Sequence, residues 1–120
     1  MENLYEKIGK DRLDLLVERF YENVFASPVI SGLFQTDKQV IIAKQKAFLT
    51  QFLGGPQLYS NEYGHPKMRM RHLPHSITVD SAQEWLRCMK DAIESMDMPD
   101  NLKVALYNCF PSLAGHMINS

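Results

Sequence analysis

Apolar residues recur with helical spacing over most of this chain, and this periodicity constrains the fold more than any other feature. They form one face of residues 13–24, while charged residues take the opposite face. The same spacing returns in residues 41–52, 82–96 and 102–117. No segment alternates polar and apolar residues for long enough to predict a strand. We therefore expect one all-α domain over residues 1–120.

Motifs typical of helix ends separate these stretches. A Ser or Thr followed three residues later by Gln or Glu is a capping box, which begins a helix, while Gly and Pro interrupt one. These signals predict a short helix at Ser27–Pro28, capping boxes at Thr36–Gln39 and Ser81–Glu84, a stop at 54–56, and a start at Asp97–Pro99. Pro111 lies inside the last stretch and is predicted to bend that helix, because proline lacks a backbone donor.

Residues 54–79 show little periodicity and hold three of the four histidines, at positions 65, 72 and 75. A loop this long inside a small domain is uncommon without a function. A surface turn with an exposed histidine is one interpretation. A zinc site of His65, His72 and His75 with a water is a second, although the spacing is loose, the sequence is not H-E-x-x-H and no cysteine joins it. A third is one axial histidine on a haem iron, with Lys44 and Arg71 as cations for the propionates.

Three polar side chains fall on otherwise apolar helical faces. Tyr21, Gln45 and Trp85 belong to three different predicted helices, and all three can donate hydrogen bonds. Each could simply bond to a backbone carbonyl in an ordinary core. Together they could instead line a cavity that receives a small polar ligand.

Charge and composition exclude several classes of function. The net charge of −1, from 13 basic and 14 acidic residues, argues against nucleic-acid binding. The longest apolar run, residues 40–43, is too short for a membrane span. No signal-peptide pattern is visible at the start, and the two cysteines form no CxxC motif. We therefore expect a cytoplasmic protein without a membrane or nucleic-acid partner.

Several motifs resemble the truncated haemoglobins, and among them the group II family of bacteria and plants. The resemblance covers nearly the whole chain. It rests on Phe20-Tyr21, Leu33-Phe34, the run from Lys44 to Pro56, Tyr63-Gly64-His65-Pro66, Arg69-Met70-Arg71-His72-Leu73-Pro74 and Trp85-Leu86-Arg87-Cys88-Met89. It implies a globin-like two-over-two helical sandwich enclosing haem b.

The resemblance also implies a role for each matching residue. It assigns His72 as the proximal iron ligand, Tyr21 and Trp85 as distal donors to the bound gas with Gln45 as a third, Phe34, Phe48 and Leu49 as apolar haem contacts, and Lys44 and Arg71 as propionate partners.

Three positions depart from the family pattern. Ile41 stands at the distal gate, where a small residue is usual, and His75 stands where Phe is common. His75 places a second imidazole three residues from His72. Pro111 interrupts the last helix.

The function implied is binding of O₂, NO, CO or peroxide at a five-coordinate haem. Two or three donors would slow O₂ release, because each hydrogen bond contributes about 1 kcal/mol. Redox chemistry on O₂, NO or peroxide, with an external reductase, is then favoured over oxygen transport. A haem-based sensor or store and a non-haem helical interaction module are the alternatives. The protein could be a monomer or a homodimer.

Overall fold

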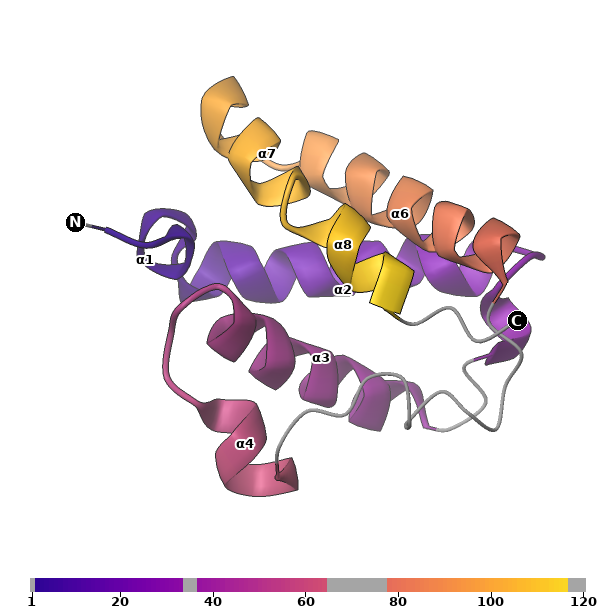
Figure 1. Cartoon of the computed structure of the whole chain (residues 1–120), viewed down its shortest axis with the longest axis horizontal. Coiled ribbons are helices and arrows are strands. Elements are labelled where there is room, and N and C mark those ends of the chain that lie inside the picture. Colours follow the sequence, from indigo (N-terminus) through magenta and orange to yellow (C-terminus); the bar gives the residue numbers. More distant parts are fainter. Residues whose placement is uncertain (1, 34–36, 65–77, 117–120) are drawn as a thin grey trace.

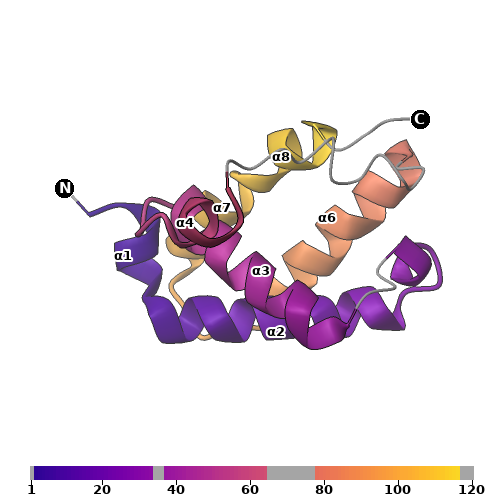
Figure 2. The same cartoon turned by 90° about the horizontal axis from the view of Figure 1, so that it is seen from below.

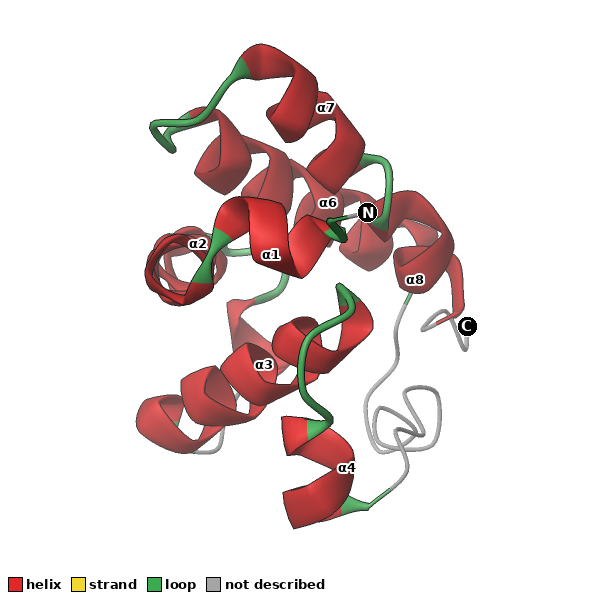
Figure 3. Ribbon diagram, turned by 90° about the vertical axis from the view of Figure 1, so that its left-hand side faces the viewer, coloured by secondary structure: helices red, strands yellow, loops and turns green. Residues whose placement is uncertain are grey.

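The computed structural model describes residues 2–33, 37–64 and 78–116, and within these ranges it contains helices and no strand (Figure 3). The expected all-α class is confirmed there. The helices are α1 (Leu4–Ile8), α2 (Lys10–Ala26), η1 (Ser31–Leu33, a 3-10 turn), α3 (Lys38–Phe52), α4 (Leu58–Tyr63), α6 (Val79–Glu94), α7 (Asp100–Tyr107) and α8 (Phe110–His116).

Helix α2 is the centre of the arrangement, because it packs against both α3 and α6. Helix α6 in turn packs against α7 and α8, and α3 packs against α4 (Figures 1 and 2). Helices α2 and α3 thus face the pair formed by α6 and α8. Helix α1 lies at the start of α2 and bonds to the end of α3, where the Tyr5 amide donates to the Leu53 carbonyl at 3.1 Å.

The predicted apolar faces form the core. Its fully buried side chains come from α2, α3, α6, α7 and α8, and from the turn after α2: Leu13, Leu16, Val17, Phe20, Val24, Ile30, Leu49, Cys88, Met89, Ile93, Leu106 and Phe110. Not every residue that the periodicity predicts inside is buried: Ile41 and Gln45 are half-buried, and Ala105 and Phe52 are exposed. Phe52 is 39% exposed. It lies at the last residue of α3, where the described chain covers only part of its ring.

Glycines end α3, as predicted from residues 54–56. Gly54 has a φ of +106°, which a side chain would strain. A Cβ on Gly55 would lie 2.8 Å from the Tyr5 ring and 2.9 Å from the Thr50 carbonyl oxygen. The absence of side chains at these two positions therefore lets α1 pack closely on the end of α3.

The structure corrects three predicted helix starts. Helix α3 is capped by Asp37, not Thr36, because the Asp37 carboxylate accepts from the amides of the second and third helical residues. Helix α6 is capped by Thr78, three residues before the predicted Ser81, whose own amide donates to Thr78. No α-helix follows Ser27, which ends α2 and leads into a turn and then η1.

Two longer segments also differ from the prediction. The stretch interpreted as a loop from residue 54 contains α4. The last periodic stretch is two helices, α7 and α8, with the break at Asn108 and Cys109. Pro111 does not bend a helix, because it lies in the first turn of α8, where no backbone donor is needed.

Candidate functional site

Tyr21 on α2 and Trp85 on α6 lie on either side of the buried Phe20. Both contact it edge-to-face, with ring centroids 4.9 Å and 5.0 Å away. Tyr21 is 3% exposed and Trp85 is 8% exposed. The packing of α2 against α6 therefore brings two of the three predicted donors to one region.

Burial sets the protonation state of Tyr21. Loss of contact with water disfavours the phenolate and raises the pKa of Tyr21 well above its usual value. The hydroxyl group consequently stays protonated at neutral pH and can act as a donor.

The side chains of Gln45 on α3 and Trp85 on α6 are alike in their hydrogen bonding. Neither side chain has a hydrogen-bond partner among the described residues. Within that part of the chain, no fully buried side-chain nitrogen or oxygen lacks a partner either. The amide of half-buried Gln45 and the indole N–H of Trp85 must therefore both border open space. This is the arrangement expected of groups that line a ligand site.

A chain of aromatic rings, which we call the aromatic arc, connects these helices. From α2 to α4 it contains Tyr21, Phe20, Trp85, Phe110, Phe52, Phe48 and Tyr59. Successive ring centroids lie between 4.9 Å and 6.2 Å apart. The arc was missed in the sequence, because its contacts join residues far apart in the chain.

Part of the arc and of the adjoining α3 face remains uncovered. Phe52 is 39% exposed, and Ile41 and Gln45 are half-buried, whereas the neighbouring Phe48 is buried. Exposed apolar surface of this kind is costly in water, at about 25 cal/mol per Å². A large flat apolar group could cover it, so these residues fit a haem. Leu49, the other predicted contact on α3, is fully buried among protein side chains.

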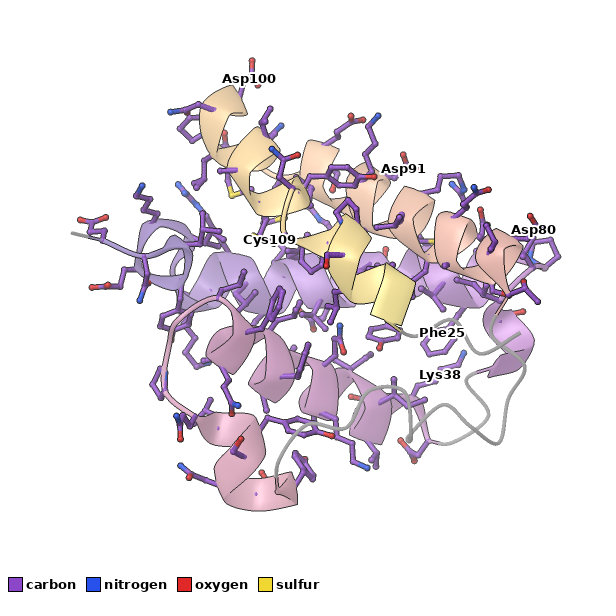
Figure 4. All side chains as sticks on the ribbon, viewed as in Figure 1. Phe25, Lys38, Asp80, Asp91, Asp100 and Cys109 are labelled. Carbon is purple, nitrogen blue, oxygen red and sulfur yellow. The ribbon has the colours of Figure 1, made fainter. Side chains whose placement is uncertain are left out.

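Lysines lie at two aromatic rings near the ends of the arc. The Lys44 ammonium sits 5.2 Å from the centre of the Tyr63 ring, which neighbours Tyr59. The Lys38 ammonium sits 4.7 Å from the Phe25 ring, which neighbours Tyr21 (Figure 4). Lys44 is the predicted propionate partner, whereas Lys38 was not singled out in the sequence.

The remaining predicted site residues lie outside the described ranges. They are the proximal ligand His72, the apolar contact Phe34, the propionate partner Arg71, and the other two histidines of the loop, His65 and His75.

A separate groove of about 590 Å³ lies between α1, α2, α3 and α4. Tyr5, Ala43, Ala47 and Leu58 provide its apolar surface, and none of the predicted site residues lines it. Its charged residues include the ion pair of Lys10 with Asp14, at 2.9 Å. The groove is therefore distinct from the aromatic arc.

The described ranges contain neither a membrane-spanning helix nor a metal-binding cluster. None of the helices described is long and apolar enough to cross a bilayer. No group of three His, Cys, Asp or Glu side chains in those ranges could hold a metal ion. The histidines of the predicted zinc alternative lie outside them.

Comparisons with known proteins point to one family. The model of the bacterial-like globin family matches residues 3–119. The group 2 truncated hemoglobin YjbI of Bacillus subtilis is 44% identical over 115 residues, which cover 96% of this chain and 87% of the relative. The group 2 truncated hemoglobin 3-1 of Lotus japonicus is 38% identical and covers 90% of this chain and 67% of the relative.

Solved structures agree in fold. A truncated oxygen-avid haemoglobin from Bacillus subtilis superimposes with a TM-score of 0.92 at 43% identity, covering 98% of this chain and 100% of that one. The group II truncated hemoglobin of Bacillus anthracis gives 0.94 at 38% identity, covering 100% and 93%. The pairing of α2 and α3 with α6 and α8 is thus the two-over-two helical fold, as expected.

Proposed function

Because the chain belongs to the bacterial-like globin family, as a group II truncated haemoglobin, it is a haem-based oxygen-binding globin, and we propose that haem b lies along the aromatic arc with Tyr21, Gln45 and Trp85 around the bound gas. His72 is the proximal ligand in this proposal, and Phe34 and Phe48 are the apolar contacts, while Leu49 remains fully buried in the protein core. Lys44 and Arg71 pair with the propionates. Two free cysteines support a reducing, cytoplasmic location.

The observation that carries the proposal is the unpartnered state of two donors. The Gln45 amide and the Trp85 indole N–H border open space and have no hydrogen-bond partner among the described residues. They belong to different helices, and Trp85 belongs to the aromatic arc that suits an apolar cofactor. Both groups are therefore available to a bound ligand, because neither is committed to a bond within the described part of the chain.

Haem, when bound, supplies an iron that binds O₂ and related gases and can exchange electrons. The chain's own residues then determine how long the gas stays. Tyr21 is protonated at any physiological pH, and burial raises its pKa further above that range, so its hydroxyl group can donate. Gln45 and Trp85 add donors whose N–H groups do not titrate. All three stabilise negative charge on the gas and exclude bulk water from it.

Slow release favours chemistry over transport. A carrier must release O₂ quickly, whereas a protein that retains it gives NO or peroxide time to react. Repeated turnover needs electrons, so we include an external reductase as a partner. A sensor or store would retain the same gas without turnover.

Reaction with NO distinguishes redox chemistry on the bound gas from a sensor or store. Adding NO to the oxygenated protein should yield nitrate in an amount equal to the O₂ lost, because one NO and one O₂ combine with one electron from the protein to form nitrate. Nitrate analysis and the change in haem absorbance measure both quantities. Displacement of O₂ without formation of nitrate would favour the sensor or store.

A further inference from the structure

A cluster of polar side chains joins the end of α2 to the beginning of α6, beside Trp85. The Ser27 hydroxyl group donates to Glu84 Oε2 at 2.5 Å. Arg87 holds the same carboxylate from the other side, with Nε 2.6 Å from Oε1 and Nη2 2.8 Å from Oε2. We call Ser27, Glu84 and Arg87 the clamp. The bond from Ser27 to Glu84 links the residue that follows α2 to the first half of α6.

Several features make the clamp stiff. Ser27 is 3% exposed, and the Glu84 side chain is 16% exposed. Ser27 Oγ also accepts from the Val29 amide at 3.3 Å, which fixes the direction of the hydroxyl group. The bonds from Arg87 and Ser27 hold the pKa of Glu84 down to about 2. The carboxylate is therefore charged at neutral pH, where it accepts strongly.

The clamp is the last of three polar contacts along one stripe of α2. Arg19 Nη1 donates to the Ser95 carbonyl at 2.7 Å, and Asn23 Nδ2 donates to the Cys88 carbonyl at 3.0 Å. Arg19 and Asn23 are four residues apart and thus lie on one face of α2, and Ser27 follows four residues later as the extended C-cap of that helix. Their partners run in the opposite direction along α6. Ser95 and Cys88 accept these bonds through their backbone carbonyls. Glu84 accepts through its side-chain carboxylate, and it is also the neighbour of Trp85 in the chain.

Rotation of α6 would displace Trp85 directly. The tip of a helical side chain lies about 5–6 Å from the helix axis, so a turn of about 10° moves it by about 1 Å. A hydrogen bond lengthened by that amount is lost. The Trp85 ring packs on Phe20 and Phe110, but these contacts do not fix the direction of its N–H as strictly as a bond would.

We propose that Glu84, held between Ser27 and Arg87, is a positioning residue that sets the rotation of α6 and thereby aims the Trp85 indole N–H at the bound gas. This inference rests on the proposed function, because it assumes that Trp85 is a donor. The clamp acts through Trp85 and does not touch the gas.

The haem-loaded protein allows a direct test, since Trp85 is its only tryptophan. In the carbon monoxide complex, the single ¹⁵N-indole resonance reports the environment of this N–H. Ser27→Ala and Glu84→Gln should each move that resonance. Each should also raise the O₂ dissociation rate roughly threefold, which is less than the tenfold expected when a bond of about 1.4 kcal/mol is lost completely. Asp91→Asn is the control. It removes the exposed 2.8 Å contact of Arg87 within α6 and should leave both readouts unchanged.

A double-mutant cycle separates the clamp from the donor. In a Trp85→Phe background, Ser27→Ala should no longer change the O₂ rate, whereas an equal increase in both backgrounds would overturn the proposal. Should Ser27→Ala fold poorly, Glu84→Gln gives the same comparison. An unmoved indole resonance in folded variants would also overturn it, leaving the clamp a source of stability alone. If Trp85→Phe itself fails to speed O₂ release, the donor role in the proposed function is what fails.

Discussion

Replacing His72 with alanine should abolish tight haem binding, or leave a weakly held haem with an altered spectrum. This residue matches the proximal ligand of the family, and an axial imidazole is the main bond between a globin and its iron. Even loss of a group that merely orients a metal ligand weakens metal binding by about 10–100-fold, so loss of the ligand itself should cost more. Titration of the apoprotein with haem, followed by absorbance, measures the effect.

His75→Ala is the matched control for this experiment. It removes an imidazole three positions further along the same segment and should keep the wild-type spectrum and affinity. The reverse outcome, a normal His72→Ala protein and a defective His75→Ala protein, would assign the iron ligand to position 75.

Removing one distal donor should raise the O₂ dissociation rate by about tenfold, if one bond of about 1.4 kcal/mol is lost. Tyr21→Phe deletes only a hydroxyl group, and Trp85→Phe keeps an aromatic ring against Phe20 and Phe110. Bound O₂ carries partial negative charge, which these donors stabilise. Stopped-flow displacement of O₂ from each variant measures the rate.

Carbon monoxide provides the internal control. It is nearly neutral when bound, so its dissociation should change much less than that of O₂ in the same variants. The double variant need not equal the sum of the single ones, since donors in one network are coupled. If neither variant speeds O₂ release, Tyr21 and Trp85 serve in packing alone.

Long periodic stretches made most of this fold predictable. The apolar stripes of α2 and α6 run over four turns or more, so their buried faces stand out in the sequence. On α3, only Phe48 and Leu49 of the predicted face are buried. Helices α1 and α4, of five and six residues, are too short to show a period and were missed. Pro111 was misread because proline breaks a helix interior but is tolerated in a first turn.

The site was predictable only in part, for a different physical reason. A polar side chain on an apolar face is visible in the sequence, and this signal found Tyr21, Gln45 and Trp85. The aromatic arc was not visible, because it depends on how five helices meet. Glu84 was read as part of a capping box, whereas its carboxylate bonds to Ser27 and Arg87. Glu84 lies three residues before Arg87, and this helical spacing was the sequence feature that could have predicted their ion pair.

In the proposed function, this chain holds one haem and binds O₂ on it through a proximal histidine and a polar distal pocket. Haem titration of the purified apoprotein, followed by exposure of the reduced complex to O₂ and then to argon, tests it most directly. We expect a Soret band that saturates at one haem per chain, shifts with O₂ and returns slowly under argon. A protein that gains no saturable Soret band, and keeps the same helical content with and without haem, would contradict it.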